Sequence, residues 1–173
     1  MSEPRVHAEP IVTARLDLLP LRVEHAEEMA VVLADPALHT FIGGAPHSPD
    51  DLRARYERLV AGSPDPGVSW CNWVLRLRAQ SRLVGTVQAT VTAAQDRGAE
   101  IAWVVGMPWQ GRGFASEAAR GLVTWLGQRS VGTVVAHIHP DHLASAAVAT
   151  AAGLAPTEEE QDGETRWRLV LPR

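Results

Sequence analysis

The sequence predicts an α+β fold built around a mixed, mostly antiparallel sheet. Near the middle of the chain, two segments alternate apolar and polar residues on either side of a short turn at Gln80–Ser81, which is typical of an antiparallel hairpin. Further on, an apolar run of strand length leads into an amphipathic helix and then into a second apolar run. A strand–helix–strand unit of this kind is a right-handed crossover, so it predicts one parallel strand pair.

The first half of the chain is expected to hold two helices and three strands. The first helix places its apolar residues on one face and ends before Asp35. The second begins after Ser48, because serine is a good N-cap and Pro49 suits the first helical position. The expected strands are residues 15–21, 73–77 and 87–91.

The second half is expected to hold the crossover and a closing segment. The crossover elements are residues 101–105, about 114–128 and 133–138. An Ala-rich helix follows and is stopped by Gly153. The acidic stretch over 156–163 is expected to be a turn, and residues 166–171 are expected to be the last strand.

Composition excludes several classes of partner. A length of 173 residues suits one domain over 1–173 with a sizeable core, and the formal net charge of −4 argues against nucleic acid. The single cysteine, Cys71, rules out an intrachain disulfide and is consistent with a reducing compartment. No apolar run approaches membrane-spanning length, so we expect a cytoplasmic protein with no membrane partner.

A Gly-Arg-Gly sequence, Gly111–Gly113, stands where the crossover strand ends and its helix begins. The first N–H groups of a helix lack internal partners and carry partial positive charge, so such a junction can bind an anion. Glycine lets the main chain approach a ligand, and the guanidinium of Arg112 suits phosphate oxygens. A Walker-type loop is excluded because the chain contains no lysine, and a dinucleotide fingerprint is excluded because Ser116 replaces its third glycine.

The segment Gln110–Ala115 resembles the pattern Gln/Arg-x-x-Gly-x-Gly/Ala of the GNAT superfamily of acetyl-CoA-dependent N-acetyltransferases. The order of the expected elements is also similar to that of the family, over about residues 11–171. The stretches TARLDLLPL and LADPAL resemble the branch that includes ribosomal-protein N-terminal acetyltransferases. The resemblance implies a sheet of about seven strands, helices on both faces, a parallel strand pair that splays apart, and acetyl-CoA as cosubstrate.

The resemblance also implies where the two substrates bind. Main-chain N–H groups of the Gly-Arg-Gly turn would hold the coenzyme pyrophosphate, and the N–H of Val104 or Val105 would stabilise the oxyanion. The loop over 39–47 would bring in the amine, with Phe41 and Trp103 as substrate contacts. The implied cofactor-binding residues are Val104, Val105, Gln110, Gly111, Arg112, Gly113, Phe114, Ala115 and His142.

Amide formation from a thioester needs a base for the amine and stabilisation of the leaving thiolate. By resemblance Glu100 is the candidate base, and an exposed strand-entry carboxylate is the structural alternative. Family members commonly place a tyrosine after the parallel strand, but Tyr56 is the only tyrosine here and belongs to the second helix. In the similar branch a serine can assist the thiolate, which makes Ser145 the second catalytic candidate, with His142 or a merely packed serine as alternatives.

Two classes of function remain open. The first is acetyl transfer from acetyl-CoA to a primary amine of a small molecule or of a protein N-terminus, with a longer acyl group or an oxygen acceptor as a variant. The second is a catalytically inactive acyl-CoA-binding module of the same fold. His137 and His139 share a strand face with His142 close by, but a fourth ligand of evident spacing is lacking, so we expect no metal. A homodimer is left open.

Overall fold

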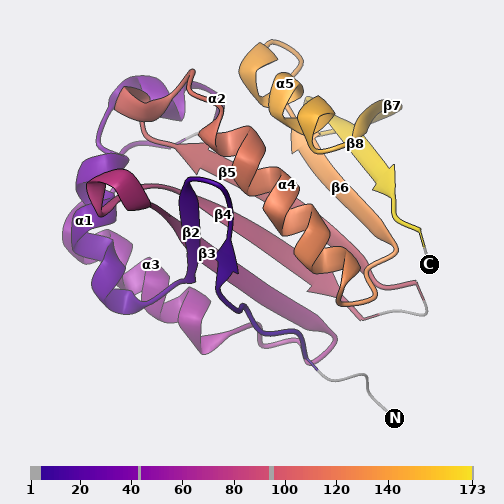
Figure 1. The fold of residues 1–173 in the computed structure, drawn as a ribbon, viewed down its shortest axis with the longest axis horizontal. Coiled ribbons are helices and arrows are strands. Elements are labelled where there is room, and N and C mark those ends of the chain that lie inside the picture. Colours follow the sequence, from indigo (N-terminus) through magenta and orange to yellow (C-terminus); the bar gives the residue numbers. More distant parts are fainter. Residues whose placement is uncertain (1–4, 43, 94–95, 173) are drawn as a thin grey trace.

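The protein is built around one eight-stranded sheet, as the computed structural model shows for residues 5–42, 44–93 and 96–172 (Figure 1). The strand order is β1-β2-β3-β4-β5-β6-β8-β7, and among these neighbours only β5 and β6 run parallel. This arrangement confirms the predicted mixed, mostly antiparallel sheet of about seven strands, and it adds two strands, β1 and β7, to the ranges expected from the sequence. The strands are β1 (Ile11–Val12), β2 (Leu16–Pro20), β3 (Val68–Leu77), β4 (Arg82–Thr92), β5 (Gly98–Val105), β6 (Thr133–Ile138), β7 (Ala155–Gln161) and β8 (Glu164–Val170).

Helices cover both faces of the sheet. The pair α4 and α5 packs together along β5 and β6, and the pair α1 and α3 packs together at the β2–β4 side (Figure 1). The predicted start of α3 is confirmed, because the hydroxyl of Ser48 accepts a hydrogen bond from the N–H of Asp51 at 3.1 Å. The helices are α1 (Ala26–Val32), α2 (His39–Ile42), α3 (Pro49–Ala61), α4 (Phe114–Gly127) and α5 (Leu143–Ala151).

One part of the core lies between the sheet and α4, and buried residues of α1 and α3 belong to the same cluster. On β4 the odd-numbered residues 87, 89 and 91 are buried, whereas the polar even-numbered residues 86–92 are not. Trp73 of β3 meets Trp125 of α4 edge-on, with 5.1 Å between the ring centroids. Such contacts between large aromatic side chains stabilise the packing of α4 on the sheet. Thr86 and Gln88, on the polar face of β4, line the cleft described below.

The parallel strands β5 and β6 pair over only part of their length. Their register joins Gly98 to Thr133 and ends with Glu100 opposite Val135. Beyond that point β5 continues to Val105 and β6 continues to Ile138, but the two strands no longer pair with each other. The expected splay of the parallel pair is therefore confirmed, and Glu100 lies at the point where the two strands part.

Two local expectations were wrong. The acidic stretch over 156–163 was expected to be a turn, but Ala155–Gln161 forms β7, at the edge of the sheet beside β8. Its side chains are nearly all exposed, so it lacks the apolar alternation that predicts a strand, and charged residues are a common feature of edge strands. The central strand also begins earlier than expected, at Gly98, which places Glu100 inside β5 rather than at its start.

No helix in the part of the chain that the structure describes is long and apolar enough to cross a membrane.

Candidate active site

The Gly-Arg-Gly loop, defined here as Gln110–Phe114, follows a short 3₁₀ helix (Met107–Trp109) after β5 and ends in the first residue of α4. Gly111 and Gly113 have φ angles of 77° and 81°, in the left-handed region that favours glycine. A Cβ added to Gly111 would meet nothing within 4 Å, so the main chain is open on that side. The side-chain amide of Gln110 donates to the carbonyl of Val105 at 2.9 Å and ties the loop to the strand. The loop therefore has an open, glycine-bearing helix start of the kind that can bind an anion.

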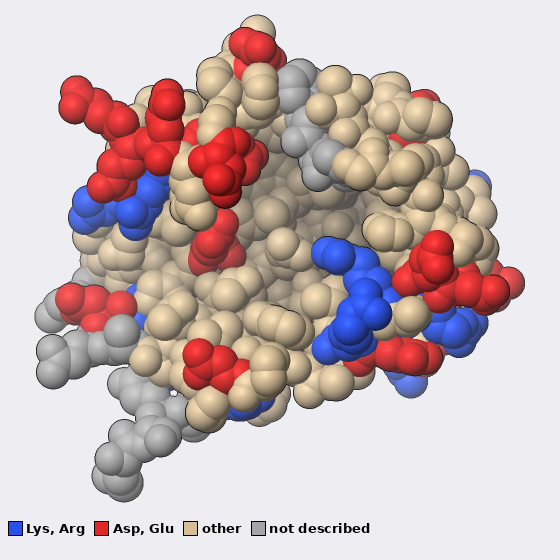
Figure 2. Space-filling model, turned by 180° about the vertical axis from the view of Figure 1, so that it is seen from behind, with Lys and Arg blue, Asp and Glu red and all other residues tan. Residues whose placement is uncertain are grey.

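A cleft of about 750 Å³ opens on the sheet face opposite α4, beside the splay of β5 and β6. Figure 2 shows this face as a hollow between raised rims. The cleft brings together five of the residues expected in the site, from β5, α5 and the turn before α5: Glu100, Trp103, Val104, His142 and Ser145. The loop residues 110–115 are not part of its lining. The two regions are joined through β5, because Val104 lines the cleft and its neighbour Val105 holds Gln110.

Glu100 and His137 form a side-chain pair in the wall of the cleft. Oε1 of Glu100 lies 2.9 Å from Nδ1 of His137, and the side chains are 55% and 16% exposed. The contact follows from the register, because Glu100 lies opposite Val135 and His137 is two residues further along the same face of β6. When Nδ1 carries a proton, the carboxylate holds the ring and leaves Nε2 to accept a second proton. Sequence reasoning named both residues but missed this contact.

His142 and Ser145 lie one helical turn apart at the start of α5. His142 occupies the N-cap position, and its Nε2 lies 3.4 Å from the hydroxyl oxygen of Ser145. Burial, helped by the neighbouring His139, lowers the pKa of His142 below the ordinary histidine value. At neutral pH the ring is therefore mainly uncharged, and the Ser145 hydroxyl can donate to Nε2 when the ring carries its proton on Nδ1.

Tyr56 belongs to α3, as expected, yet it lines the same cleft as Glu100 and Ser145. The residue is 4% exposed, and its hydroxyl has no hydrogen-bond partner among the described residues. Burial raises the pKa of Tyr56 to about 12, so it stays protonated as a donor. The indole N–H of Trp103 is likewise buried without a partner in the described part of the chain. No sequence signal places Tyr56 in the cleft, because only the tertiary packing of α3 brings it there.

The expected acceptor-side segment borders the cleft. His39 and His47, at the two ends of the loop over 39–47, contribute to its lining. Phe41 lies in α2, but its side chain falls outside the described residues. His137 and His139 do not belong to any cluster of three or more potential ligands that could hold a metal ion, as far as the described residues reach.

Residues 15–155 match the family described as the acetyltransferase (GNAT) domain. Among solved structures, the chain is similar to a GNAT-family acetyltransferase from Bacillus anthracis, with 17% identity, a TM-score of 0.75 and coverage of 94% of this chain and 98% of that one. It is also similar to the Salmonella typhimurium acetyl transferase that modifies the N-terminal serine of ribosomal protein L7/L12, with 16% identity, a TM-score of 0.75 and coverage of 95% and 100%. An acetyltransferase from Agrobacterium tumefaciens has 22% identity, a TM-score of 0.72 and 99% coverage of each chain. No curated protein sequence matches the chain.

The glycine-bearing start of α4, the splayed parallel strands and the family match define an acyltransferase that uses a coenzyme A thioester. The chain belongs to the acetyltransferase (GNAT) domain family. Similar structures have been solved with coenzyme A, as in a RimL ribosomal-protein acetyltransferase, and with acetyl-CoA and AMP, as in the microcin C7 self-immunity acetyltransferase MccE. Acetyl-CoA is accordingly the cosubstrate of this enzyme.

Proposed function

We propose that the chain, acting as a single domain over 1–173, transfers the acetyl group of acetyl-CoA to a primary amine of a small molecule or of a protein N-terminus. The observation that carries this proposal is the Glu100–His137 pair, which stands in the cleft wall where β5 and β6 part. A cationic amine must lose a proton before it can attack a thioester, and a carboxylate–imidazole pair at that point can take it.

The Gly-Arg-Gly loop would hold the pyrophosphate, with Gly111, Gly113, Phe114 and Ala115 offering main-chain N–H groups and Arg112 its positive charge. No acceptor among the described residues takes the N–H of Gly111 or Gly113. When bound, acetyl-CoA supplies an activated acyl carbon and a thiolate leaving group. The splay of β5 and β6 next to Val104 offers the space in which its arm would lie.

Different residues of the cleft serve the different steps of acetyl transfer. The Glu100–His137 pair takes one proton from the cationic amine before it attacks. The second proton leaves the nitrogen once its bond to the acyl carbon has formed, and it neutralises the departing thiolate. The N–H of Val104 or Val105 stabilises the negative oxygen. As the carbon–sulfur bond breaks, Ser145 donates a hydrogen bond to the departing sulfur, and the ring of His142 lies next to the serine hydroxyl. Tyr56 provides a second buried hydroxyl donor in the same wall.

The charges of the cleft favour a cationic acceptor. Three acidic residues line it, namely Glu100, Asp162 and Glu164, whereas Arg55 is the only arginine among the residues that line it. The negative side chains attract a cationic substrate and raise its local concentration in the cleft. The red rim to the upper left of the hollow in Figure 2 shows acidic side chains gathered on this face.

Matched acceptors test the proposal. The protein is incubated with acetyl-CoA and with pairs of compounds that differ only in an amine or a hydroxyl group, together with peptides whose N-terminus is free or blocked. We expect products one acetyl group heavier from the amines and from the free peptides, and none from their matched partners. Acetylation of the alcohols alone would contradict the proposed acceptor class. Binding of coenzyme A without any acetylated product would favour the inactive module instead.

A further inference from the structure

The turn between β1 and β2 is bound directly to the first turn of α4. The carboxylate of Glu117 accepts hydrogen bonds from the Thr13 hydroxyl at 2.5 Å, from the Arg15 N–H at 2.9 Å and from Nε of Arg15 at 2.7 Å. The side chain of Glu117 is 11% exposed. Hydrogen bonds to a charged group with little solvent around it are among the stronger ones in proteins. Residues about a hundred positions apart are thereby fixed together beside the Gly-Arg-Gly loop.

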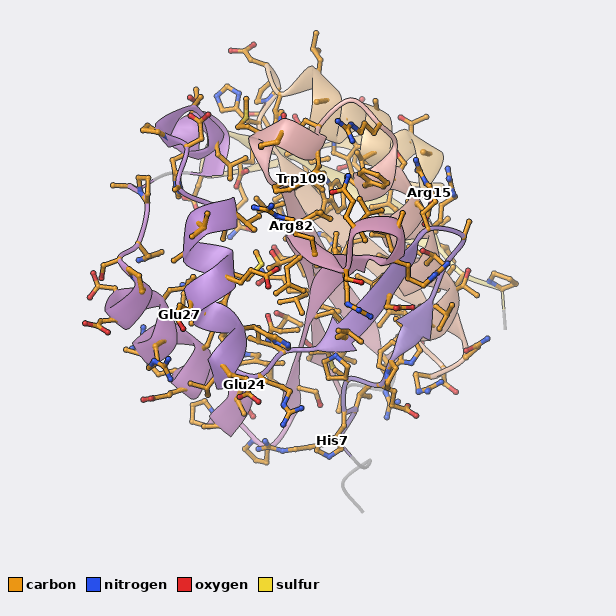
Figure 3. The ribbon with its side chains drawn as sticks, turned by 60° about the vertical axis from the view of Figure 1, so that its left-hand side comes forward. His7, Arg15, Glu24, Glu27, Arg82 and Trp109 are labelled. Carbon is orange, nitrogen blue, oxygen red and sulfur yellow. The ribbon has the colours of Figure 1, made fainter. Side chains whose placement is uncertain are left out.

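The guanidinium of Arg15 also reaches the loop itself. Its Nη1 donates to the carbonyl of Arg112 at 2.9 Å, and its central carbon lies 4.3 Å from the centroid of the Phe114 ring. A planar guanidinium over an aromatic face gains from a cation–π contact, and its fork can hold two acceptors at once. Figure 3 shows Arg15 projecting from the β1–β2 turn, with Trp109 and Arg82 further along the same side of the molecule.

The turn that carries Arg15 is held in place in its own right. Arg78 donates to the carbonyls of Thr13 and Ala14 at 2.7 Å and 2.6 Å and to that of Leu16 at 2.7 Å. These bonds fill the acceptors of the turn, so its backbone has one well-defined path. The backbone that carries the Arg15 side chain is therefore fixed in position.

The bond to the Arg112 carbonyl determines where the next N–H points. The carbonyl of residue 112 and the N–H of residue 113 belong to one planar trans peptide, in which they point in opposite directions. With the carbonyl turned toward Arg15, the N–H of Gly113 is turned away from Arg15 and has no acceptor among the described residues. If that peptide flipped, a carbonyl oxygen would face the bound anion, which would repel it.

We propose that Arg15 and Glu117 position the Gly-Arg-Gly loop for the coenzyme pyrophosphate, by holding the Arg112–Gly113 peptide with its N–H toward the phosphate. This inference rests on the proposed role of the loop in coenzyme binding. Arg15 acts through the loop backbone, and Glu117 acts through Arg15.

A direct contact between Arg15 and phosphate is the competing explanation, and it predicts a different response to the Glu117→Gln substitution. If Arg15 is simply a phosphate ligand, removing the negative charge of Glu117 beside it leaves coenzyme affinity unchanged or raises it. If the pair positions the loop, the same substitution loosens Arg15 and lowers the affinity. Arg15→Lys separates the explanations as well, because lysine keeps the charge but lacks the fork that holds both Glu117 and the Arg112 carbonyl.

The experiment measures affinity for two probes by titration calorimetry: coenzyme A, and S-acetylpantetheine, which carries the thioester arm but no pyrophosphate. The variants are Arg15→Met, Arg15→Lys and Glu117→Gln, and Arg53→Met on the exposed side of α3 is the matched control. We expect Arg15→Met and Arg15→Lys to weaken coenzyme A at least tenfold, or about 1.4 kcal/mol, and Glu117→Gln at least threefold. The affinity for S-acetylpantetheine should stay within twofold, and Arg53→Met should match the parent for both probes.

Each other outcome contradicts the inference. Weaker coenzyme binding in Arg15→Met together with unchanged or tighter binding in Glu117→Gln would make Arg15 a direct ligand. An equal loss of affinity for both probes would show that Arg15 and Glu117 only support the overall fold. If Arg15→Met does not fold, the comparison of the two probes in Glu117→Gln decides alone. Parent-like binding in all variants overturns the positioning role and leaves the proposed function intact, whereas a parent protein that does not bind coenzyme A overturns both.

Discussion

At the residue scale, the chemistry depends on a few side chains whose partners are defined by the structure. Glu100 is half exposed and His137 is mostly covered, so the pair has one member in contact with water and one inside the cleft wall. In that arrangement a proton taken from the acceptor can pass through the pair to solvent. The pair is therefore the first target for substitution.

Replacing Glu100 with glutamine removes the carboxylate and keeps the shape of the side chain. We expect kcat/KM to fall by about ten- to a hundredfold below pH 7, where an α-amino group with a pKa of about 7.7–8.0 is mostly protonated and needs a base. The loss should shrink as the pH rises and free amine becomes abundant, and coenzyme affinity should stay within about twofold. A pH–rate profile that superimposes on that of the parent would remove Glu100 from the mechanism.

Ser145 and His142 compete for the role at the leaving sulfur. If the hydroxyl stabilises the thiolate, Ser145→Ala lowers kcat by about ten- to a hundredfold, or about 1.4–2.7 kcal/mol, with little change in acetyl-CoA affinity. Alanine is the best helix former and both neighbours of Ser145 are alanine, so α5 should keep its fold. His142→Ala should have the smaller effect.

The roles of these two residues exchange if the histidine variant loses the rate and the serine variant keeps it. In that case the parent's rate should depend on a group that titrates below the ordinary histidine pKa, because burial lowers the pKa of His142. Stopped-flow measurement of thiol release for both variants distinguishes the two assignments.

At the element scale, the Gly-Arg-Gly loop depends on backbone conformations that only glycine adopts easily. Gly113→Val should weaken coenzyme A at least tenfold, or about 1.4 kcal/mol, because valine strains a φ of 81° and its branched side chain would block the close approach of a phosphate to the main chain. The matched control is Gly163→Val in the β7–β8 turn, where φ is 80° and an added Cβ meets nothing within 4 Å.

Both glycine variants should lose comparable stability in urea unfolding, since both carry the same backbone strain. Only Gly113→Val should lose coenzyme affinity by calorimetry. Equal affinities in the two folded variants would contradict the assignment of the loop to the pyrophosphate.

The junction between the β1–β2 turn and α4 predicts a pH-dependent stability. Burial opposes the ionisation of Glu117, but hydrogen bonds from Thr13 and Arg15 outweigh it and hold the pKa of this carboxyl below its ordinary value. Such a group contributes stability above its unfolded pKa of about 4.3, and that contribution is lost as the pH falls through its lower folded pKa. Glu117→Gln should therefore lower the free energy of unfolding by about 1–3 kcal/mol at pH 7, and this loss should shrink as the pH falls below about 4.5.

Urea unfolding of the parent and of Glu117→Gln across this pH range checks the sign. A difference that stays constant or grows toward acid would show that the Glu117 bonds do not depend on its charge.

At the scale of the whole molecule, the sequence predicts the parts of the fold that local chemistry specifies. Ser48 and Pro49 mark the start of α3, and the glycines at 111 and 113 mark the start of α4, because caps and left-handed turns leave clear residue signals. The edge strand β7 leaves no such signal, since nearly all its side chains face water. Its pairing with β8 is a property of the assembled sheet.

The sequence also predicts only part of the candidate site. Glu100 and Ser145 could be placed in one cleft from the sequence because the element order and the motif fix β5 and α5. The bond between Glu100 and His137 requires the register of β5 against β6, and the contact of Arg15 with Arg112 requires two segments 97 positions apart to meet. Tyr56 enters the cleft only through the packing of α3. Such long-range contacts leave no local pattern.

The central claim is that this cleft couples thioester cleavage to amine acetylation, and a stoichiometry measurement tests it most directly. With acetyl-CoA and the best amine acceptor, the free thiol released and the acetylated amine formed are counted in the same reaction by a thiol reagent and by mass spectrometry. The account predicts one thiol for each acetylated amine, with both rates falling together in Glu100→Gln. Thiol release without acetylated amine, or neither product from a protein that binds coenzyme A, would contradict it.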